Sequence, residues 1–258
     1  MRAPSRARWR SLPVLQPVKR RVMRLQKIYW KYSRPLYCEL IPTPPARRIL
    51  VVSPHIDDDV IGCGGVLAQH IGAGATVASL YLRDGGSTRE AEAHEAAKLI
   101  GISDLIFLRW PKSDVWMQPD RIGAFRDIVE RAAPDIVYAP FFLDPHPDHA
   151  AATRLLVEAA DRGTAIGQCY LYEVWSPLVP NALVDITGQA PTKRQLINTH
   201  RSQVADIDMA QGVLGLNAYR AEMNRVHGYA EAFLRLRPNE LARMLCRVDR
   251  NGEGTTDA

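Results

Sequence analysis

Short apolar runs alternate with amphipathic helical patterns over much of the chain. The runs are rich in Val, Ile and Leu, a composition typical of parallel strands that are buried on both faces. The runs lie at residues 49–53, 76–82, 104–108 and 135–141, and the helical patterns at about residues 59–72, 88–100, 120–132 and 148–160. This alternation predicts an α/β fold of the Rossmann-like, doubly wound kind, with a mostly parallel sheet and helices on both faces.

The pattern changes toward the C-terminus. Apolar runs at 169–175 and 182–186 follow each other without a helical pattern between them, and helical segments follow at about 191–205 and 239–247. The two runs predict an antiparallel edge or a small cap of strands and helices beside the sheet. We expect the folded domain to cover residues 48–248 and residues 249–258 to form a disordered tail.

The N-terminal segment has a different charge from the rest of the chain. Residues 1–48 contain 13 of the 33 Lys and Arg residues but a single acid, Glu39, whereas the remainder has a net charge of −7. Residues 18–32 predict a basic amphipathic helix, because apolar residues recur there at steps of four and three. Three prolines between residues 42 and 45 then predict a linker. The sequence thus predicts a basic arm over residues 1–47 and an acidic folded body.

The predicted helix at 18–32 has three interpretations. It packs on the acidic body, lies on an anionic membrane surface, or contacts nucleic acid. Trp30, Tyr29 and Tyr32 stand among its cations and favour an interface over plain solvent. Nucleic acid is the least favoured partner, because an enzyme acting on it would carry positive charge on its folded part too.

The spacing of the cysteines and the lengths of the apolar runs indicate the cellular compartment. The four cysteines have no C-x-x-C spacing, so neither a zinc ribbon nor a disulfide framework is indicated. The chain has no run of about 18 apolar residues, the length that a membrane helix needs. We therefore expect a cytoplasmic protein; if the helix at 18–32 is the membrane contact, it lies on the inner face of the membrane. The sequence does not determine the oligomeric state.

The first motif with chemical potential follows the first predicted strand. Residues 53–59 read Ser-Pro-His-Ile-Asp-Asp-Asp and place His55 beside Asp57, Asp58 and Asp59. Ligands bind at the carboxyl ends of parallel strands. Three adjacent carboxylates repel one another by several kcal/mol when buried, and a divalent cation relieves that repulsion. Capping of the next helix, worth about 0.3–1 kcal/mol, accounts for Asp59 but not for His55.

A second polar motif follows the strand predicted at 135–141. Residues 144–149 read Asp-Pro-His-Pro-Asp-His, and Pro147 suits the first turn of a helix. His146 and His149 are three residues apart, so a helix start can direct both toward one point, and Asp148 can orient an imidazole. The two motifs together predict a metal centre. Two histidines and one carboxylate suit catalytic zinc and also non-haem iron, but the iron oxygenases normally use an antiparallel scaffold.

These residues resemble the LmbE/PIG-L family of zinc-dependent de-N-acetylases. The family signatures P-H-P-D-D-E and H-P-D-H correspond to residues 54–59 and to residues 146–149. The resemblance extends over about residues 48–235 and includes glycines at 62, 64 and 65. Here Ile56 replaces the usual proline and Asp59 replaces the usual glutamate. Ile56 should affect only the stiffness of the loop. Asp59 is one methylene shorter than glutamate, so the contact that the family's glutamate makes is either lost or bridged by water.

The resemblance implies a role for each residue of the two motifs. His55, Asp58 and His149 would bind the metal, Zn²⁺ by preference although the same ligands accept Fe²⁺. Asp57 would be the general base, and a protonated His146 with Asp148 behind it would stabilise the transition state. Asp59 would support the ligands from behind.

Three further residues are weaker candidates. The resemblance places Arg89, His200 and Gln203 near the substrate, although a solvated Arg89 and a structural polar network around His200 are alternatives. Close packing of a helix on the sheet accounts better for the glycines at 62, 64 and 65 than phosphate binding does, because they do not form G-x-G-x-x-G.

The resemblance implies that an N-acetylated amino sugar or its conjugate, such as a glycoside, a lipid-linked sugar or a thiol-bearing glycoside, loses its acetyl group by hydrolysis. If the helix at 18–32 anchors the protein, a lipid-linked or nucleotide-linked sugar of glycan biosynthesis is the expected form. Two other functions stay open: a metal-dependent amidase acting on a non-sugar or thiol-conjugate amide, and a non-catalytic carbohydrate-binding protein. The absent phosphate fingerprint disfavours a nucleotide-dependent transferase.

Overall fold

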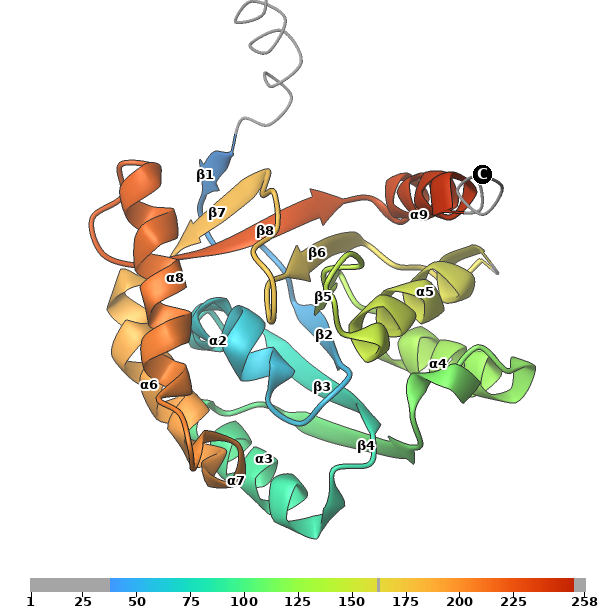
Figure 1. The fold of residues 1–258 in the computed structure, drawn as a ribbon, viewed down its shortest axis with the longest axis horizontal. Helices are drawn as coiled ribbons and strands as arrows, with labels where there is room; N and C mark the ends of the chain where they lie inside the picture. Colours follow the sequence, from blue (N-terminus) through green and yellow to red (C-terminus); the bar gives the residue numbers. More distant parts are fainter. Residues whose placement is uncertain (1–37, 162, 253–258) are drawn as a thin grey trace, which may run out of the picture. The chain divides into compact units, whose positions relative to one another are not determined.

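The computed structural model describes residues 38–161 and 163–252, and these form an eight-stranded sheet in the order β1-β7-β8-β6-β5-β2-β3-β4 (Figure 1). Neighbouring strands are parallel except where β8 pairs antiparallel with β6 and with β7. The strands are β1 Glu39–Ile41, β2 Arg48–Ser53, β3 Thr76–Arg83, β4 Asp104–Trp110, β5 Ile136–Pro140, β6 Gln168–Tyr172, β7 Ala182–Asp185 and β8 Ala230–Leu236.

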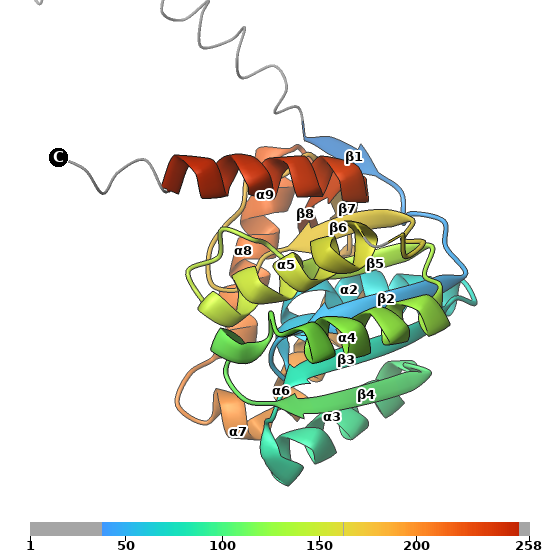
Figure 2. The ribbon, with the colours of Figure 1, turned by 90° about the vertical axis from the view of Figure 1, so that its right-hand side faces the viewer.

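Helices cover both faces of the sheet (Figures 1 and 2). Helices α4, α5 and α9 lie on one face, and α2, α3, α6 and α8 lie on the other. Their bounds are α2 Asp58–Gly72, α3 Gly86–Ile100, α4 Pro119–Ala132, α5 Pro147–Asp161, α6 Ala190–Thr199, α7 Arg201–Val204, α8 Met209–Met223 and α9 Pro238–Gly252. The predicted fold class, a mostly parallel α/β sheet between two helical layers, is confirmed.

Side chains that point alternately to the two faces of the central strand β2 explain why helices pack on both sides of the sheet. On β2, Leu50 and Val52 pack into the apolar core on the α4–α5 side, whereas Ile49 and Val51 pack into the core on the α2 side. Successive side chains of a strand point to opposite faces, so a strand that is apolar at every position serves two cores.

The C-terminal region differs from the sequence prediction. Strands β6 and β7 are not adjacent, because β8 lies between them and pairs with both. The prediction also lacked α8, whose glycines at 212 and 215 lower helix propensity. Strand β1 lies in the segment predicted as arm and linker, and it pairs with β7. Three residues followed by Pro42 are too short a signal for a strand. Helix α9 continues to Gly252, beyond the predicted end at 247.

Helix α2 is packed unusually close to the sheet. It is kinked at Cys63, whose φ of −141° and ψ of 15° are not helical. A Cβ at Gly62 would lie 2.1 Å from Tyr172 Cδ2, and one at Gly65 would lie 2.8 Å from the Ile186 side chain. Close helix–sheet packing is therefore confirmed as the role of these two glycines.

The second half of α2 has its own capping group on a distant strand. Backbone N–H groups of Gly65 and Val66 each donate to the Glu231 carboxylate at 2.8 Å. Lys193 Nζ lies 2.6 Å from the same carboxylate, and both charged side chains are fully buried. A carboxylate at a helix N-terminus is stabilised by the helix dipole, and the lysine neutralises its charge.

The helix predicted over 18–32 and the end of the predicted tail, 253–258, lie outside the described residues. Within the part of the chain that the structure describes, no helix is both long and apolar enough to cross a membrane.

The packing of α2 leads to a stability test. Gly62→Ala should lower the free energy of unfolding by about 1–3 kcal/mol, because the added methyl overlaps the Tyr172 ring. Gly72→Ala in the same helix is the matched control, since a Cβ there meets no atom within 4 Å. It should stabilise the protein by about 0.5–1 kcal/mol. Urea unfolding measures both, and equal effects of the two variants would contradict the packing argument.

Candidate metal centre and active site

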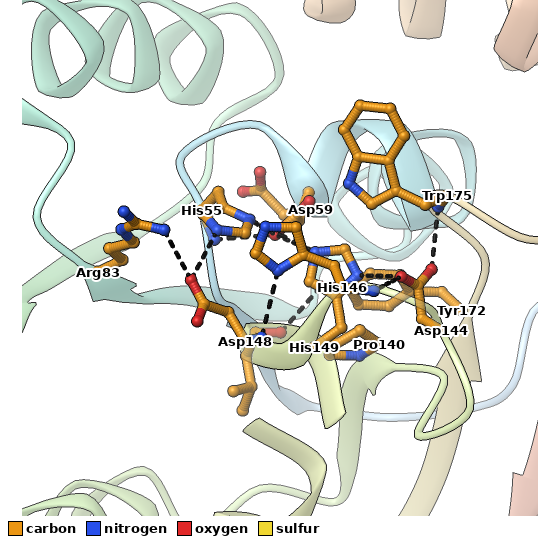
Figure 3. A network of polar contacts seen from close by, with 12 residues as sticks. His55, Asp59, Arg83, Pro140, Asp144, His146, Asp148, His149, Tyr172 and Trp175 are labelled. Carbon is orange, nitrogen blue, oxygen red and sulfur yellow. Dashed lines mark hydrogen bonds and ion pairs between the residues drawn. The ribbon is translucent and has the colours of Figure 1, made fainter. Parts of the chain in front are cut away.

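Two loops bring the polar motifs together at one edge of the sheet. The first follows β2 and the second follows β5, and these two strands are parallel neighbours. They end at the same edge, where His55 of the first loop lies beside His149 in the first turn of α5 (Figure 3). Asp58, the first residue of α2, contacts both histidines. A cavity of about 440 Å³ opens onto this point and is lined by residues that include His55, Asp57, Asp58, Arg89, His146 and Trp175.

Three ligand atoms form a small triangle at the base of the cavity. Asp58 Oδ2 lies 3.2 Å from His55 Nδ1 and 3.4 Å from His149 Nε2, and the two ring nitrogens are 3.4 Å apart. Two atoms bound to one tetrahedral zinc at about 2.1 Å lie about 3.4 Å from each other. The triangle therefore fits a metal ion held by His55, Asp58 and His149. A wider cluster within 4.8 Å combines His55 and His149 with His146.

Each of the two imidazoles has a carboxylate on its outer nitrogen. His55 Nε2 lies 3.0 Å from Asp148 Oδ2, and His149 Nδ1 lies 3.1 Å from Asp144 Oδ1. Figure 3 shows the two carboxylates outside the histidine cluster. Such partners fix the ring orientation and direct the other nitrogen toward the metal. The centre thus has the second layer of contacts that metal sites in proteins normally have.

Both outer carboxylates are held by further contacts. Asp148 also accepts from Arg83 Nη1 at 2.9 Å and from the Ser113 backbone N–H at 3.2 Å. Asp144 accepts from the backbone N–H groups of His146 and Trp175. Neither Asp144 nor Arg83 is among the site residues predicted from the sequence. Asp144 stood inside the recognised motif, so its position was a usable signal, whereas nothing local marked Arg83.

The charges of the ligands respond to this arrangement. Burial raises the pKa of Asp58, but the contacts with His149 and His55 outweigh it and hold the pKa well below its usual range. Burial lowers the pKa of His149, yet Asp58 and Asp144 outweigh it and raise the pKa to about 10. In the metal-free protein a proton on His149 therefore supplies the positive charge that a metal ion would bring.

Asp57 is the carboxylate that stays free of the triangle. It lines the cavity and is 9% exposed, and its carboxylate accepts no hydrogen bond from the described residues. Burial, followed by the charge of Asp58, raises the pKa of Asp57 to about 7. A carboxyl with such a pKa can both accept and return a proton near neutral pH.

His146 faces the cavity as a hydrogen-bond donor. The Asp148 backbone N–H donates to His146 Nδ1 at 3.2 Å, so a neutral ring carries its proton on Nε2. Burial, with the neighbouring His55 and His149 charges, lowers the pKa of His146 and favours this neutral ring. The structure differs here from the expectation of a protonated His146 backed by Asp148, because that carboxylate lies behind His55 instead.

The two departures from the family signature both have structural consequences. Asp59 is fully buried and accepts directly from Tyr81 Oη at 2.7 Å and Ser79 Oγ at 2.9 Å, so its shorter side chain is not left without partners. Ile56 is 1% exposed and packs against Tyr81 and Ala93. The expectation that Ile56 affects only loop stiffness is wrong, because α3 closes over this loop.

The three weaker candidates lie in different surroundings. Arg89 and Gln203 line the cavity, but His200 does not. His200 is 1% exposed, and neither ring nitrogen has a hydrogen-bond partner among the described residues. The neighbouring Ser202 instead joins α7 to α3 by donating to Glu92 through both its N–H and its hydroxyl. Arg89 and Gln203 therefore lie at the site, whereas His200 is buried and does not line the cavity.

Comparison with known families agrees with this geometry. Residues 50–160, which include both metal-binding loops, match the family model described as "PIG-L: GlcNAc-PI de-N-acetylase". Residues 50–160 of the chain thus match the PIG-L/LmbE family. The resemblance inferred from residues 54–59 and 146–149 is thereby confirmed.

The curated relatives of this PIG-L domain protein include two sugar deacetylases. Diacetylchitobiose deacetylase of Thermococcus kodakarensis is 25% identical over 201 residues, which cover 63% of this chain and 72% of that protein. A second relative is 1D-myo-inositol 2-acetamido-2-deoxy-α-D-glucopyranoside deacetylase of Kineococcus radiotolerans. It is 27% identical and covers 66% of this chain and 73% of its own. Both are hydrolases of amide bonds, and the predicted enzyme class is confirmed.

Solved structures confirm the fold of the PIG-L domain. N,N′-diacetylchitobiose deacetylase of Pyrococcus horikoshii is 24% identical with a TM-score of 0.66, covering 83% of this chain and 92% of that one. The 4-carboxy-2-hydroxymuconate hydratase of Pseudomonas putida is also 24% identical, with a TM-score of 0.61. The match covers 74% of this chain and 97% of that one. The scaffold therefore also occurs in an enzyme that adds water without breaking an amide.

Metal binding to the PIG-L domain should release protons. Because the pKa of His149 is raised to about 10, its ring is protonated at pH 7.5 and must lose that proton to bind a metal. The affinity for Zn²⁺ should therefore rise as the pH is increased from 6.5 to 8.5. Calorimetric titration in buffers of different ionisation enthalpy should give at least about one proton released per Zn²⁺. His227→Gln, on a side chain that is 99% exposed, should not alter that number. Zinc binding without proton release would contradict the protonation of His149.

The outer carboxylate Asp144 should control metal affinity. Asp144→Asn should weaken Zn²⁺ binding by about 10–100-fold, because the His149 ring loses its charged partner. Competition with a chelating dye measures the affinity, and Asp127→Asn, on an exposed part of α4, is the control. Unchanged Zn²⁺ affinity in the Asp144 variant would mean that this side chain only stabilises the loops, by accepting from the backbone N–H groups of His146 and Trp175.

Proposed function

We propose that the protein is a metal-dependent N-deacetylase that removes the acetyl group from an N-acetylated amino sugar or its conjugate. The observation that carries the proposal is the triangle of His55 Nδ1, Asp58 Oδ2 and His149 Nε2 at the base of a cavity that also presents Asp57. The two sugar deacetylases among the curated relatives support the substrate class.

The proposed mechanism combines a metal ion with one proton-transferring carboxylate. A Zn²⁺ or Fe²⁺ ion held by His55, Asp58 and His149 would lower the pKa of a water molecule and polarise the amide carbonyl. Asp57 takes the proton from the attacking water, since its carboxylate is adjacent to a ligand and not needed to bind the ion. The same carboxyl then returns that proton to the amine that leaves.

His146 and the cavity rim hold the reacting amide. The Nε2–H of His146 donates to the oxygen that becomes negative as the carbonyl is attacked; such donors contribute about 2.7–4 kcal/mol in other enzymes. Asp148 keeps the His55 ring in place and so acts through a metal ligand. Arg89 and Gln203 line the cavity, where their polar groups can bind sugar hydroxyls.

The substrate assay must separate a deacetylase from a hydratase of the same fold. Zn²⁺-loaded and Fe²⁺-loaded protein should release acetate from simple N-acetylglucosaminides, and UDP-linked and lipid-linked forms give the range of conjugates. Chelation should abolish the release and either ion should restore it. Acetate release from no N-acetylated amino sugar by the metal-loaded protein would reject the proposal.

The role of Asp57 has a direct test. Asp57→Asn should retain the metal while kcat falls by about 10²–10⁴-fold, because the proton acceptor is lost. Metal content is measured by mass spectrometry beside the acetate assay. Asp104→Asn, at the exposed start of β4, is the control for a lost carboxylate. Normal turnover in the Asp57 variant would refute the assignment of the base.

A further inference from the structure

A second cavity adjoins the one over the metal centre. It has a volume of about 270 Å³ and lies between α2, the loop after β6 and the start of α8. The two cavities share four lining residues: Ile61, Val174, Trp175 and Met209. A ligand in the first cavity can therefore extend into the second without leaving the protein surface.

The walls of the second cavity are apolar. Beyond the shared residues they include Val213 and Leu216 of α8 and Ile207 in the preceding loop. Trp175 and Ile207 are 61% and 54% exposed, high values for large apolar side chains. Exposed apolar surface that is concave and continuous with a reaction site is typical of a place where a ligand covers it.

Charged groups in the second cavity already have partners. Glu173 accepts from the Leu178 backbone N–H and pairs with Arg220, and Asp208 accepts from the Gln211 backbone N–H at the start of α8. Neither lysine nor arginine is among the described residues that line this cavity. A phosphate would therefore find no cation there, which argues against a nucleotide diphosphate in this space.

One polar atom at the cavity lacks a partner. Asn217 lines the cavity and is 5% exposed, yet its Oδ1 accepts no hydrogen bond from the described residues. This oxygen is itself inaccessible to solvent, so it does not make the cavity wall polar. The walls therefore suit a mostly apolar occupant.

We propose that the second cavity binds an uncharged, apolar aglycone of the amino-sugar substrate. The proposal rests on the deacetylase function proposed above, since it assigns the other end of the same substrate. The sugar and its N-acetyl group lie over the metal centre, and the aglycone passes Trp175 to contact α8. Turnover should then depend on the aglycone as well as on the sugar.

The test compares methyl and octyl glycosides of N-acetylglucosamine with the Zn²⁺-loaded full chain. The octyl glycoside should have a kcat/KM at least about tenfold higher, because each methylene removed from water adds up to about fourfold. Equal values for two glycosides that are both hydrolysed would overturn the aglycone site. Faster acyl release from N-octanoylglucosamine than from N-acetylglucosamine would also overturn it, because the cavity would then receive the departing acyl chain.

A binding measurement separates this proposal from the proposed reaction. Octyl glucoside lacks an amide and, below its micelle concentration, should bind the Zn²⁺-loaded protein in calorimetry where methyl glucoside does not. Octyl glucoside binding without any acetate release would reject the deacetylase and retain the apolar cavity. Absence of octyl glucoside binding would overturn the cavity site.

Paired variants test whether the preference for the octyl glycoside arises in the second cavity. Gly212 lines the cavity and Gly215 does not, and a Cβ at either position meets no atom within 4 Å. Gly212→Trp should reduce the octyl-to-methyl ratio of kcat/KM toward one, whereas Gly215→Trp should leave the ratio unchanged. Ile207→Ser should also reduce it, by about threefold or more. Val179→Ser, at a 57% exposed position outside the cavity, is its control. Equal ratios within both pairs would overturn the proposal.

Discussion

The balance of buried negative charge determines how this site is built. Asp57, Asp58, Asp144 and Asp148 converge at one sheet edge, and each is 9% exposed or less. An unpaired carboxylate in such surroundings costs several kcal/mol. Three of the four have a histidine against them, and only Asp57 has no hydrogen-bond partner among the described residues. The imidazoles cannot satisfy this charge and stay neutral at the same time. A divalent cation would remove that conflict and would leave Asp57 as the one carboxylate without a partner among the described residues.

The fold meets this demand with contacts from distant parts of the chain. Parallel pairing of β2 with β5 sets the two metal-binding loops side by side. Helix α2 begins with Asp58 at the candidate metal centre, is kinked at Cys63 and continues along the sheet, and Tyr172 of β6 fills the space that Gly62 leaves. The PIG-L match ends at residue 160, yet the capping carboxylate of α2 and most of the wall of the second cavity come from the chain beyond it. The C-terminal region is therefore part of the active site's framework rather than an appendage.

Local spacing predicted most of the centre, and three-dimensional packing decided the rest. The parallel strands and the motif residues His55, Asp58 and His149 could be found because each lies in a short, periodic or charged segment. Which imidazole each outer carboxylate faces depends on ring orientation, and so Asp148 was placed behind the wrong histidine. The burial of Ile56 depends on α3 closing over its loop, which no local pattern records. Strand β8 was missed because its pairing partners, β6 and β7, are separated from it by α6, α7 and α8 in sequence.

The Glu231 cap has a consequence for how the protein is made. A chain leaving the ribosome has every metal ligand by residue 149, but the carboxylate that holds Gly65 and Val66 is still 82 residues from synthesis. Without β8, the N–H groups of Gly65 and Val66 would lack the carboxylate to which they donate. The metal-binding half of the sequence is thus complete well before its central helix is stable.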